Sequence, residues 1–303
     1  FRDENWELMR INPDGSQLEN LTNTPDIDEL YPQSSPDGTK LAFMADEDKD
    51  GERRRAICLM DADGANRVEI ADNGREPFWS PDGAEIGYAL GTFKDPMHDI
   101  YANEGLYFYN VETGKTRVHP NKDISAVLSP CFSKDGRWIV TSLMRSRDIG
   151  EAIVAIQADG LHIVELIHSA RRGDTVRLWQ CRPDISPDNR KIAWGKEDDF
   201  KQMWVEVAEA NLTTVAPSIG EIKRVATGKP MNYVYHMDWS PDGRFLAFSQ
   251  GPQGGRMDRA RYAIGNKAPG WNIYVCDPTQ PETVVQITTD GMSNKEPEWV
   301  KIP

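Results

Sequence analysis

The chain has 303 residues, with 35 basic and 48 acidic side chains and a formal net charge of −13. A chain this acidic is not expected to bind nucleic acid, because phosphate backbones are bound mainly through Lys and Arg. It contains no run of about 20 uncharged apolar residues, so a membrane-spanning helix is excluded.

A turn motif recurs five times along the chain. It reads Ser-Pro-Asp-Gly or a close variant, and it occupies residues 35–38, 80–83, 133–136, 186–189 and 240–243, at spacings of 45, 53, 53 and 54 residues. Pro fixes φ and Gly accepts positive φ, so the motif favours tight turns. A short β-type run follows each copy, as at Leu41-Ala42-Phe43, and a second series of turns lies about half a period away. The pattern predicts units of four short antiparallel strands, which we name a to d in chain order.

Units of 45 to 55 residues with four strands each are typical of β-propeller blades. Five units lie within the chain, and the two ends supply parts of one more, because Glu296-Pro297-Glu298-Trp299 repeats the strand-a pattern of Glu76-Pro77-Phe78-Trp79. We therefore predict an all-β, six-bladed propeller that forms a single domain, 1–303. Its closing blade is shared between residues 1–22 and 294–303, and seven blades are the alternative. Phe1 to Asn5 looks like the end of a strand b, so we expect residues upstream of Phe1.

The repeat resembles that of the TolB-type propellers, bacterial relatives of the WD-type propellers. The matching segments are Pro77–Gly83, Met237–Gly243 and Leu59–Gly64, and the resemblance extends over nearly the whole chain. It implies a binding scaffold that is exported to the periplasm or the cell surface. A propeller fold by itself implies no reaction, because propellers carry many unrelated functions.

Two enzyme families carry similar propellers. Prolyl-oligopeptidase-like enzymes add a hydrolase domain with a GxSxG motif, which is absent from this chain. Oligogalacturonate lyases resemble a propeller with a metal held by a His and Gln cluster, whereas the five His of this chain form no close pair. No cofactor is expected, since the four Cys form neither CxxC nor CxxCH.

Two hypotheses about function follow. The first is a non-catalytic, exported propeller that binds a protein partner, either as a free scaffold or as a subunit of a periplasmic complex. The second is a carbohydrate-binding or lyase-like propeller with a ligand or metal on its axis.

Alignment of the repeats on their serines places a varied polar series near the start of strand a, the innermost strand. The members of this series, which we call the axial ring, are Tyr31, Glu76, Ser129, Arg182, His236 and Glu296. Their mixture of charges suits a polar ligand or a peptide terminus. Glu76, His236 and Glu296 also carry atoms suited to a metal, and the sequence leaves open whether they meet at one ion. The alternative is a solvated channel lining without a specific ligand.

Loop length predicts where a partner binds. The b–c and d–a connections are long and share one end of the ring, which we call the long-loop face; the tight a–b turns lie at the other end. Long loops on a rigid scaffold are where binding usually resides. The longest insertion, 250–270, carries Arg256, Arg259, Arg261 and Tyr262, which we predict to contact an anionic part of a partner; a solvated loop is the alternative.

One loop begins like a calcium site. Asp46 to Gly51 has the spacing of the first half of an EF-hand loop, but Ile57 stands where such a loop needs a bidentate Glu. A charged hairpin is therefore favoured over a calcium site.

Overall fold

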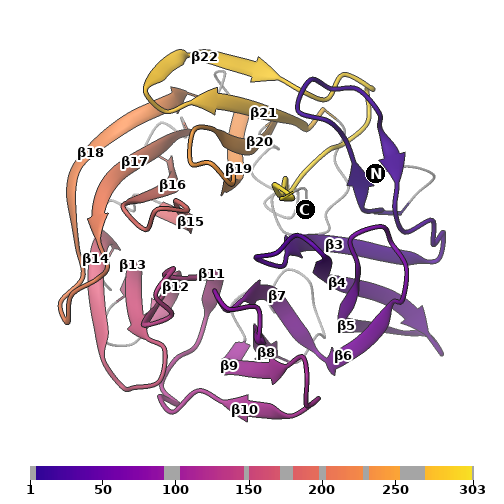
Figure 1. Cartoon of the computed structure of the whole chain (residues 1–303), viewed down its shortest axis with the longest axis horizontal. Helices are drawn as coiled ribbons and strands as arrows, with labels where there is room; N and C mark the ends of the chain where they lie inside the picture. The colour runs from indigo at the N-terminus through magenta and orange to yellow at the C-terminus, as the bar shows by residue number, and fades with distance from the viewer. Residues whose placement is uncertain are drawn as a thin grey trace.

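The computed structural model describes residues 5–91, 103–146, 150–170, 180–197, 203–227, 232–252 and 270–301. Five four-stranded antiparallel sheets surround a common axis, and in each sheet the strands pair in chain order from the innermost to the outermost (Figure 1).

These sheets are the blades. Blade one comprises β3 (Ile27–Ser34), β4 (Lys40–Lys49), β5 (Glu52–Asp61) and β6 (Val68–Asp72), and blade two β7 (Gly74–Trp79), β8 (Glu85–Gly91), β9 (Asn103–Asn110) and β10 (Thr116–Val118). Blade three comprises β11 (Val127–Phe132), β12 (Trp138–Ser146), β13 (Gly150–Gln157) and β14 (Ile163–Ala170). Blade four comprises β15 (Gln180–Ile185), β16 (Lys191–Glu197), β17 (Met203–Asn211) and β18 (Ser218–Thr227), and blade five β19 (Asn232–Trp239), β20 (Leu246–Pro252), β21 (Asn272–Asp277) and β22 (Gln280–Gln286).

The recurring motif forms the turn between strands a and b in every blade. In blade one, the Ser35 hydroxyl donates a hydrogen bond to the Asp37 carboxylate at 2.6 Å and accepts one from the backbone N–H of Lys40 at 2.9 Å. The hydrogen bonds from Ser35 and from the backbone lower the pKa of Asp37 to about 2, and Gly38 has a φ of 76°. The same Ser to Asp bond occurs in the other four copies of the motif.

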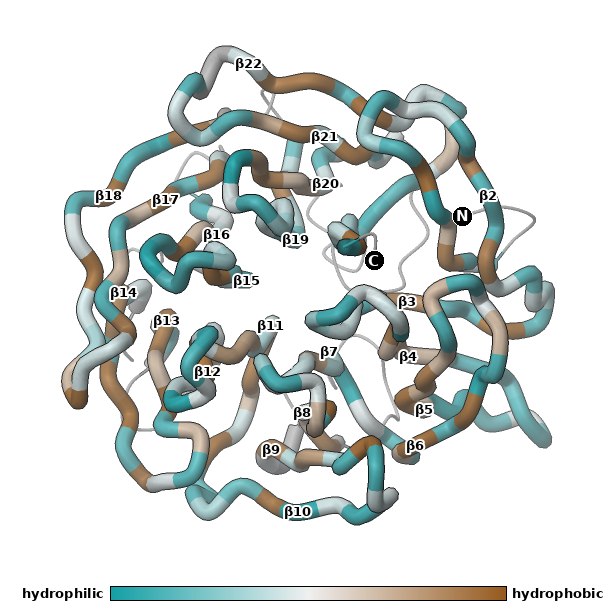
Figure 2. Tube along the Cα trace, viewed as in Figure 1, coloured by the Kyte–Doolittle hydropathy of each residue, from teal (hydrophilic) through white to brown (hydrophobic). Residues whose placement is uncertain are grey.

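Hydrophobic side chains pack between neighbouring blades. Phe78 of blade two lies 5.2 Å, centroid to centroid, from Phe132 of blade three. Ile185 and the fully buried Trp194 of blade four pack in one cluster with Val140 of blade three. Figure 2 shows hydrophobic stretches recurring in the strands, with hydrophilic residues concentrated in the turns. Phe132, Ile185 and Trp239, which directly precede the motif serine, are buried, as inter-blade packing requires.

The predicted six-bladed ring is wrong, and so is the seven-bladed alternative. The described residues form five four-stranded blades and one two-stranded sheet, β1 (Met9–Arg10) with β2 (Glu19–Asn20). Residues 294–301 lie near the axis, as predicted for a strand a, but they form no ladder with the rest of that sheet within the described ranges. Their hydrogen bonds run instead to the blades on either side: the Glu298 carboxylate accepts the N–H of Ser34, and Trp299 donates its N–H to Asp238.

Candidate functional site

Every member of the axial ring has a left-handed backbone. The φ values are 54° for Tyr31, 47° for Glu76, 47° for Ser129, 59° for Arg182, 53° for His236 and 56° for Glu296. In each of the five blades, strand a has one more residue than strand b at this point of the ladder, so strand a contains a β-bulge. The residue after the axial-ring residue is Pro in four of the five blades. Pro fits a bulge because it has no N–H to add to the ladder. The bulge places five of the predicted residues around the axis, and Glu296 has the same left-handed backbone without a paired strand in the described ranges.

Side chains of the axial ring contact one another across blades. The Arg182 guanidinium donates to the Ser129 hydroxyl at 2.9 Å and lies 3.6 Å from a Glu76 carboxylate oxygen. Glu76 in turn accepts the N–H of Ser129. On the other side, the rings of Tyr31 and His236 meet edge to face at 4.9 Å. These contacts link blades two, three and four on one side of the axis, and blades one and five on the other.

The axial ring is packed and not solvated. Its six side chains are only 2% to 6% exposed. Burial, with the charge of Arg182, lowers the pKa of His236 to about 3, so its imidazole is neutral at physiological pH. Burial raises the pKa of Glu296 for the same reason, because a charged group is poorly solvated there. This low exposure differs from that expected of side chains that line an open, solvated channel.

Three buried atoms of the axial ring have no hydrogen-bond partner within the described part of the chain. They are Oε1 of Glu76, Nδ1 of His236 and Oε1 of Glu296. A buried polar atom without a partner is costly, so such atoms point to a ligand or to ordered water.

A second tier of side chains, which the sequence analysis missed, lies two residues after the axial ring. Its members are Gln33, Phe78, Cys131, Asp184, Asp238 and Glu298. Each strand a runs toward its tight a–b turn, so this second tier lies on the tight-turn side of the axial ring. The detectable signal was the two-residue alternation of a strand, which brings three carboxylates of successive repeats to the same level.

The three carboxylates of the second tier join successive sectors of the ring, where a sector is one blade or the segment 294–301. Asp184 accepts the N–H of Trp239 at 2.9 Å, Asp238 accepts that of Trp299, and Glu298 accepts that of Ser34 at 2.8 Å. Each carboxylate therefore bonds to the backbone of the sector that follows it around the axis.

These carboxylates hold their protons more tightly than ordinary ones. Burial raises the pKa of Glu298 to about 8, and the charge of Asp184 adds to the effect. Burial also raises the pKa of Asp238 well above its usual range, with further contributions from Glu298 and Asp184. Asp184 and Asp238 lie close enough to share a hydrogen bond. The group accordingly binds protons near neutral pH.

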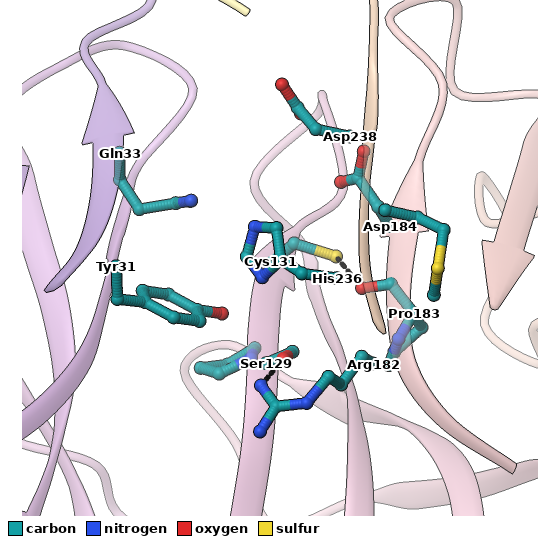
Figure 3. Close-up of a pocket in the computed structure, with 11 residues that line it drawn as sticks. Tyr31, Gln33, Ser129, Cys131, Arg182, Pro183, Asp184, His236 and Asp238 are labelled. Carbon is teal, nitrogen blue, oxygen red and sulfur yellow. Dashed lines mark hydrogen bonds between the residues drawn. The ribbon is translucent and has the colours of Figure 1, made fainter. Parts of the chain in front are cut away.

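A small pocket lies between the two tiers (Figure 3). Tyr31, Ser129, Arg182 and His236 line it from the axial ring, and Gln33, Cys131, Asp184 and Asp238 line it from the second tier. Its volume is about 20 Å³, which is room for roughly one water molecule. Cys131 is a free thiol, and burial raises its pKa well above the usual range, so it is not a reactive nucleophile.

The predicted metal ligands and the predicted partner contacts are not brought together into a site within the described residues. Within the described ranges, no three His, Cys, Asp or Glu side chains are grouped so as to hold a metal ion, so Glu76, His236 and Glu296 do not form such a site. The predicted partner contacts Arg256, Arg259, Arg261 and Tyr262 lie outside the described residues.

The segment that begins like a calcium loop is a hairpin. β4 and β5 pair as far as Lys49 and Glu52, and Asp50 and Gly51 both have positive φ, as a two-residue I′ turn requires. The Asp46 carboxylate is buried against the Arg55 guanidinium, with two contacts of 2.6 Å. The charged-hairpin interpretation therefore fits the structure.

Similar solved structures share this architecture, although no protein-family model matches the chain. TolB from Acinetobacter baumannii superposes with a TM-score of 0.69 and 17% identity, covering 97% of this chain and 62% of that one. A glycoside hydrolase family 74 enzyme from Niastella koreensis has a TM-score of 0.57 and 12% identity, covering 93% and 42%. Oligogalacturonate lyase from Vibrio parahaemolyticus has a TM-score of 0.50 and 15% identity, covering 97% and 90%.

These similarities establish the fold. The chain has the β-propeller fold of TolB, as the repeat predicted, and it spans 62% of the length of the TolB chain. At such identities the comparison shows architecture, and function has to be argued from the site itself.

Proposed function

We propose that this protein is a non-catalytic propeller scaffold that binds a protein partner. The observation that supports this most directly is the packed axial ring, whose six side chains are buried. Its members come from separate inner segments, and hydrogen bonds join Tyr31 to Glu296, Ser129 to Glu76 and Arg182 to Ser129, so the ring is suited to holding these segments together. A rigid ring that displays loops is a common architecture for protein binding.

The size of the axial pocket argues against the oligosaccharide alternative. Sites for small molecules typically enclose about 300 to 1,000 Å³. The axial pocket encloses about 20 Å³. A sugar ring does not fit that volume, so the geometry favours neither a lyase-like site nor a carbohydrate site on the axis.

The long-loop face is where we propose that the partner binds. The β4–β5 hairpin belongs to this face, and its tip residues Lys49, Asp50 and Glu52 are exposed. Arg53, which directly follows the tip, contacts the Asp28 carboxylate of β3 at 2.6 Å, so the hairpin is tied to the neighbouring strand close to its charged tip. Arg256, Arg259, Arg261 and Tyr262 remain part of this proposal as further partner contacts.

Export to the periplasm or cell surface is part of the proposal and rests on the resemblance of the repeat. Within the described ranges, no helix combines the length and apolar character needed to cross a membrane. Fractionation of cells that produce the protein tests this part: recovery in the cytoplasmic fraction alone would contradict export.

Site-specific crosslinking tests the binding face. A photoreactive residue at Glu52, on the hairpin tip, is expected to capture one defined polypeptide in cells. The matched control is Asp159, an exposed residue in the tight turn between β13 and β14 at the opposite end of the ring, with 81% of its side chain exposed. Capture of no protein at Glu52, or of the same proteins at both positions, would contradict the proposed face.

A further inference from the structure

The axial pocket has a buried floor and partly exposed walls. Tyr31 and His236 of the axial ring form the floor, at 2% and 4% exposure. Gln33, Asp184 and Asp238 form walls that are only partly buried. We call this feature the axial recess, and it lies on the tight-turn side of the axial ring (Figure 3).

Carboxyl groups outnumber basic groups at the walls of the axial recess. Asp184 and Asp238 line the recess and Glu298 interacts with both: the charge of Asp184 raises the pKa of Asp238 and of Glu298, and the charge of Glu298 raises that of Asp238. Lys134 stands where the other copies of the turn motif have Pro. Its positive charge lowers the pKa of all three carboxyls, but by less than burial raises it. Arg182 in the floor is engaged by Ser129, Glu76 and the ring of Tyr235. A cation entering the recess would relieve the repulsion among the carboxylates.

The floor supplies an independent indication that a donor belongs in the recess. The His236 side chain is buried, and its Nδ1 has no hydrogen-bond partner within the described residues. A neutral imidazole has one nitrogen that accepts a hydrogen bond. A ligand that carries N–H donors would satisfy this atom and the wall carboxylates at once.

The volume of the recess and the arrangement of its side chains limit which cations can bind there. A volume of about 20 Å³ admits a head group the size of a water molecule and excludes a bulky quaternary amine. The described residues show no His, Cys, Asp and Glu grouping that suits a metal ion. An ammonium group is compact and has three donors and no acceptor, which matches the carboxylates and the imidazole nitrogen.

We infer that the axial recess binds a primary ammonium group, carried by a free alkylamine or by a lysine side chain. This site lies at the opposite end of the axis from the long-loop face, so it does not depend on the function proposed above.

Thermal unfolding and calorimetry with propylammonium chloride test the inference at pH 8, where an alkylamine with a pKa of about 10.4 stays protonated. Propylammonium is expected to bind saturably and to raise the melting temperature. Asp238→Asn and Asp184→Asn are each expected to weaken binding about tenfold or more, because each removes a carboxyl group that can ionise against the bound ammonium group. Asn still accepts the backbone N–H that the Asp carboxylate accepts, so both variants keep their bonds between sectors.

Matched controls separate this site from general salt effects. Asp159→Asn makes the same charge change at a remote exposed position and is expected to bind propylammonium as the unaltered protein does. Tetramethylammonium has the same charge but no N–H donor and is expected not to bind. Equal binding by Asp238→Asn and the unaltered protein, equal effects of the two ammonium ions, or stabilisation by calcium chloride but not by propylammonium would each overturn the inference.

A second arm identifies the carrier of the ammonium group. If Nα-acetyl-lysine amide binds as well as propylammonium, the recess accepts a lysine side chain of a polypeptide. If only propylammonium binds, the ligand is a free amine. Both results support the ammonium site, whereas binding of neither compound overturns it.

Discussion

The chemistry at the axis depends on a few buried carboxylates. Glu298 accepts hydrogen bonds from Ser34 and Gln33, yet burial beside Asp184 and Asp238 makes its neutral form the favoured one. Hydrogen bonds and charge repulsion therefore act in opposite directions on the same side chain, and desolvation decides the balance. The inferred ammonium ion would shift that balance toward the ionised carboxylates.

The pH dependence of stability checks this account of Glu298. Its pKa rises from 4.5 to about 8, so the folded state binds more protons than the unfolded state between these values. Its contribution is then complete below about pH 4.5 and is lost as the pH rises through about 8. Glu298→Gln, which stays neutral, is expected to be more stable than the unaltered protein at pH 8 by on the order of 4 kcal/mol, and nearly equal at pH 4.5.

Urea denaturation across this pH range measures the difference. Asp184, Asp238 and Lys134 remain in both proteins, so the difference measures Glu298 together with its effect on the pKa of Asp238. Glu112→Gln, at an exposed position, is the control and is expected to follow the unaltered protein. Parallel curves for Glu298→Gln and the unaltered protein would contradict the raised pKa.

The bulge in strand a leaves one backbone N–H without an acceptor in the strand ladder, and neighbouring blades supply that acceptor. The left-handed residue directs its N–H away from the ladder, and the strand b before it in the chain supplies an acceptor: Ser142 Oγ for Arg182, and Ser249 Oγ for Glu296. In β8 the equivalent residue is Ala89, which has no acceptor, and there the Glu76 carboxylate accepts the N–H of Ser129. The axial ring and the inner strands are thus one hydrogen-bonded unit.

Removal of one such acceptor tests this account of the strand. Ser249→Ala leaves the N–H of Glu296 buried without its partner, which is expected to lower the free energy of unfolding by about 1 to 3 kcal/mol. Ser218→Ala, in the exposed part of β18, is the matched control and is expected to change stability by less than about 0.5 kcal/mol. Chemical denaturation gives both values, and equal small effects would show that the acceptor is dispensable.

The ring is held together where its two ends meet. Residues 294–301 contact blade one through Glu296, which accepts the N–H of Tyr31, and through Lys301, whose carbonyl packs against Gly38. They contact blade five through the bond from Trp299 to Asp238. A few side-chain and turn contacts therefore join these segments where a complete blade would supply a strand ladder.

Two equivalent turn glycines test that junction. Gly38 and Gly136 occupy the same place in the motif, with φ values of 76° and 71°. A Cβ at Gly136 meets nothing within 4 Å, whereas a Cβ at Gly38 would collide with the Lys301 carbonyl. Gly136→Ala is expected to cost about 1 kcal/mol for the left-handed backbone, and Gly38→Ala about 1 to 3 kcal/mol more. Equal losses in denaturation experiments would mean that the contact with residue 301 does not hold the ring.

The sequence predicted the propeller and the axial ring because both follow from a local repeat. Turn chemistry set the strand boundaries, and the strand direction placed the same repeat residue of each blade at the same level. The Pro that follows the axial residue marks the bulge, although the left-handed conformation that turns Tyr31 and His236 toward each other was not evident from the sequence.

The number of blades and the nature of the site were decided by tertiary structure. The match between Glu296-Pro297-Glu298-Trp299 and strand a correctly placed this segment near the axis, but a strand becomes part of a blade only through a paired neighbour. The burial of the axial ring and the interaction of Asp184, Asp238 and Glu298 arise from residues more than 50 positions apart. Repeats determine local geometry, whereas solvation and charge interactions depend on which sectors meet around the axis.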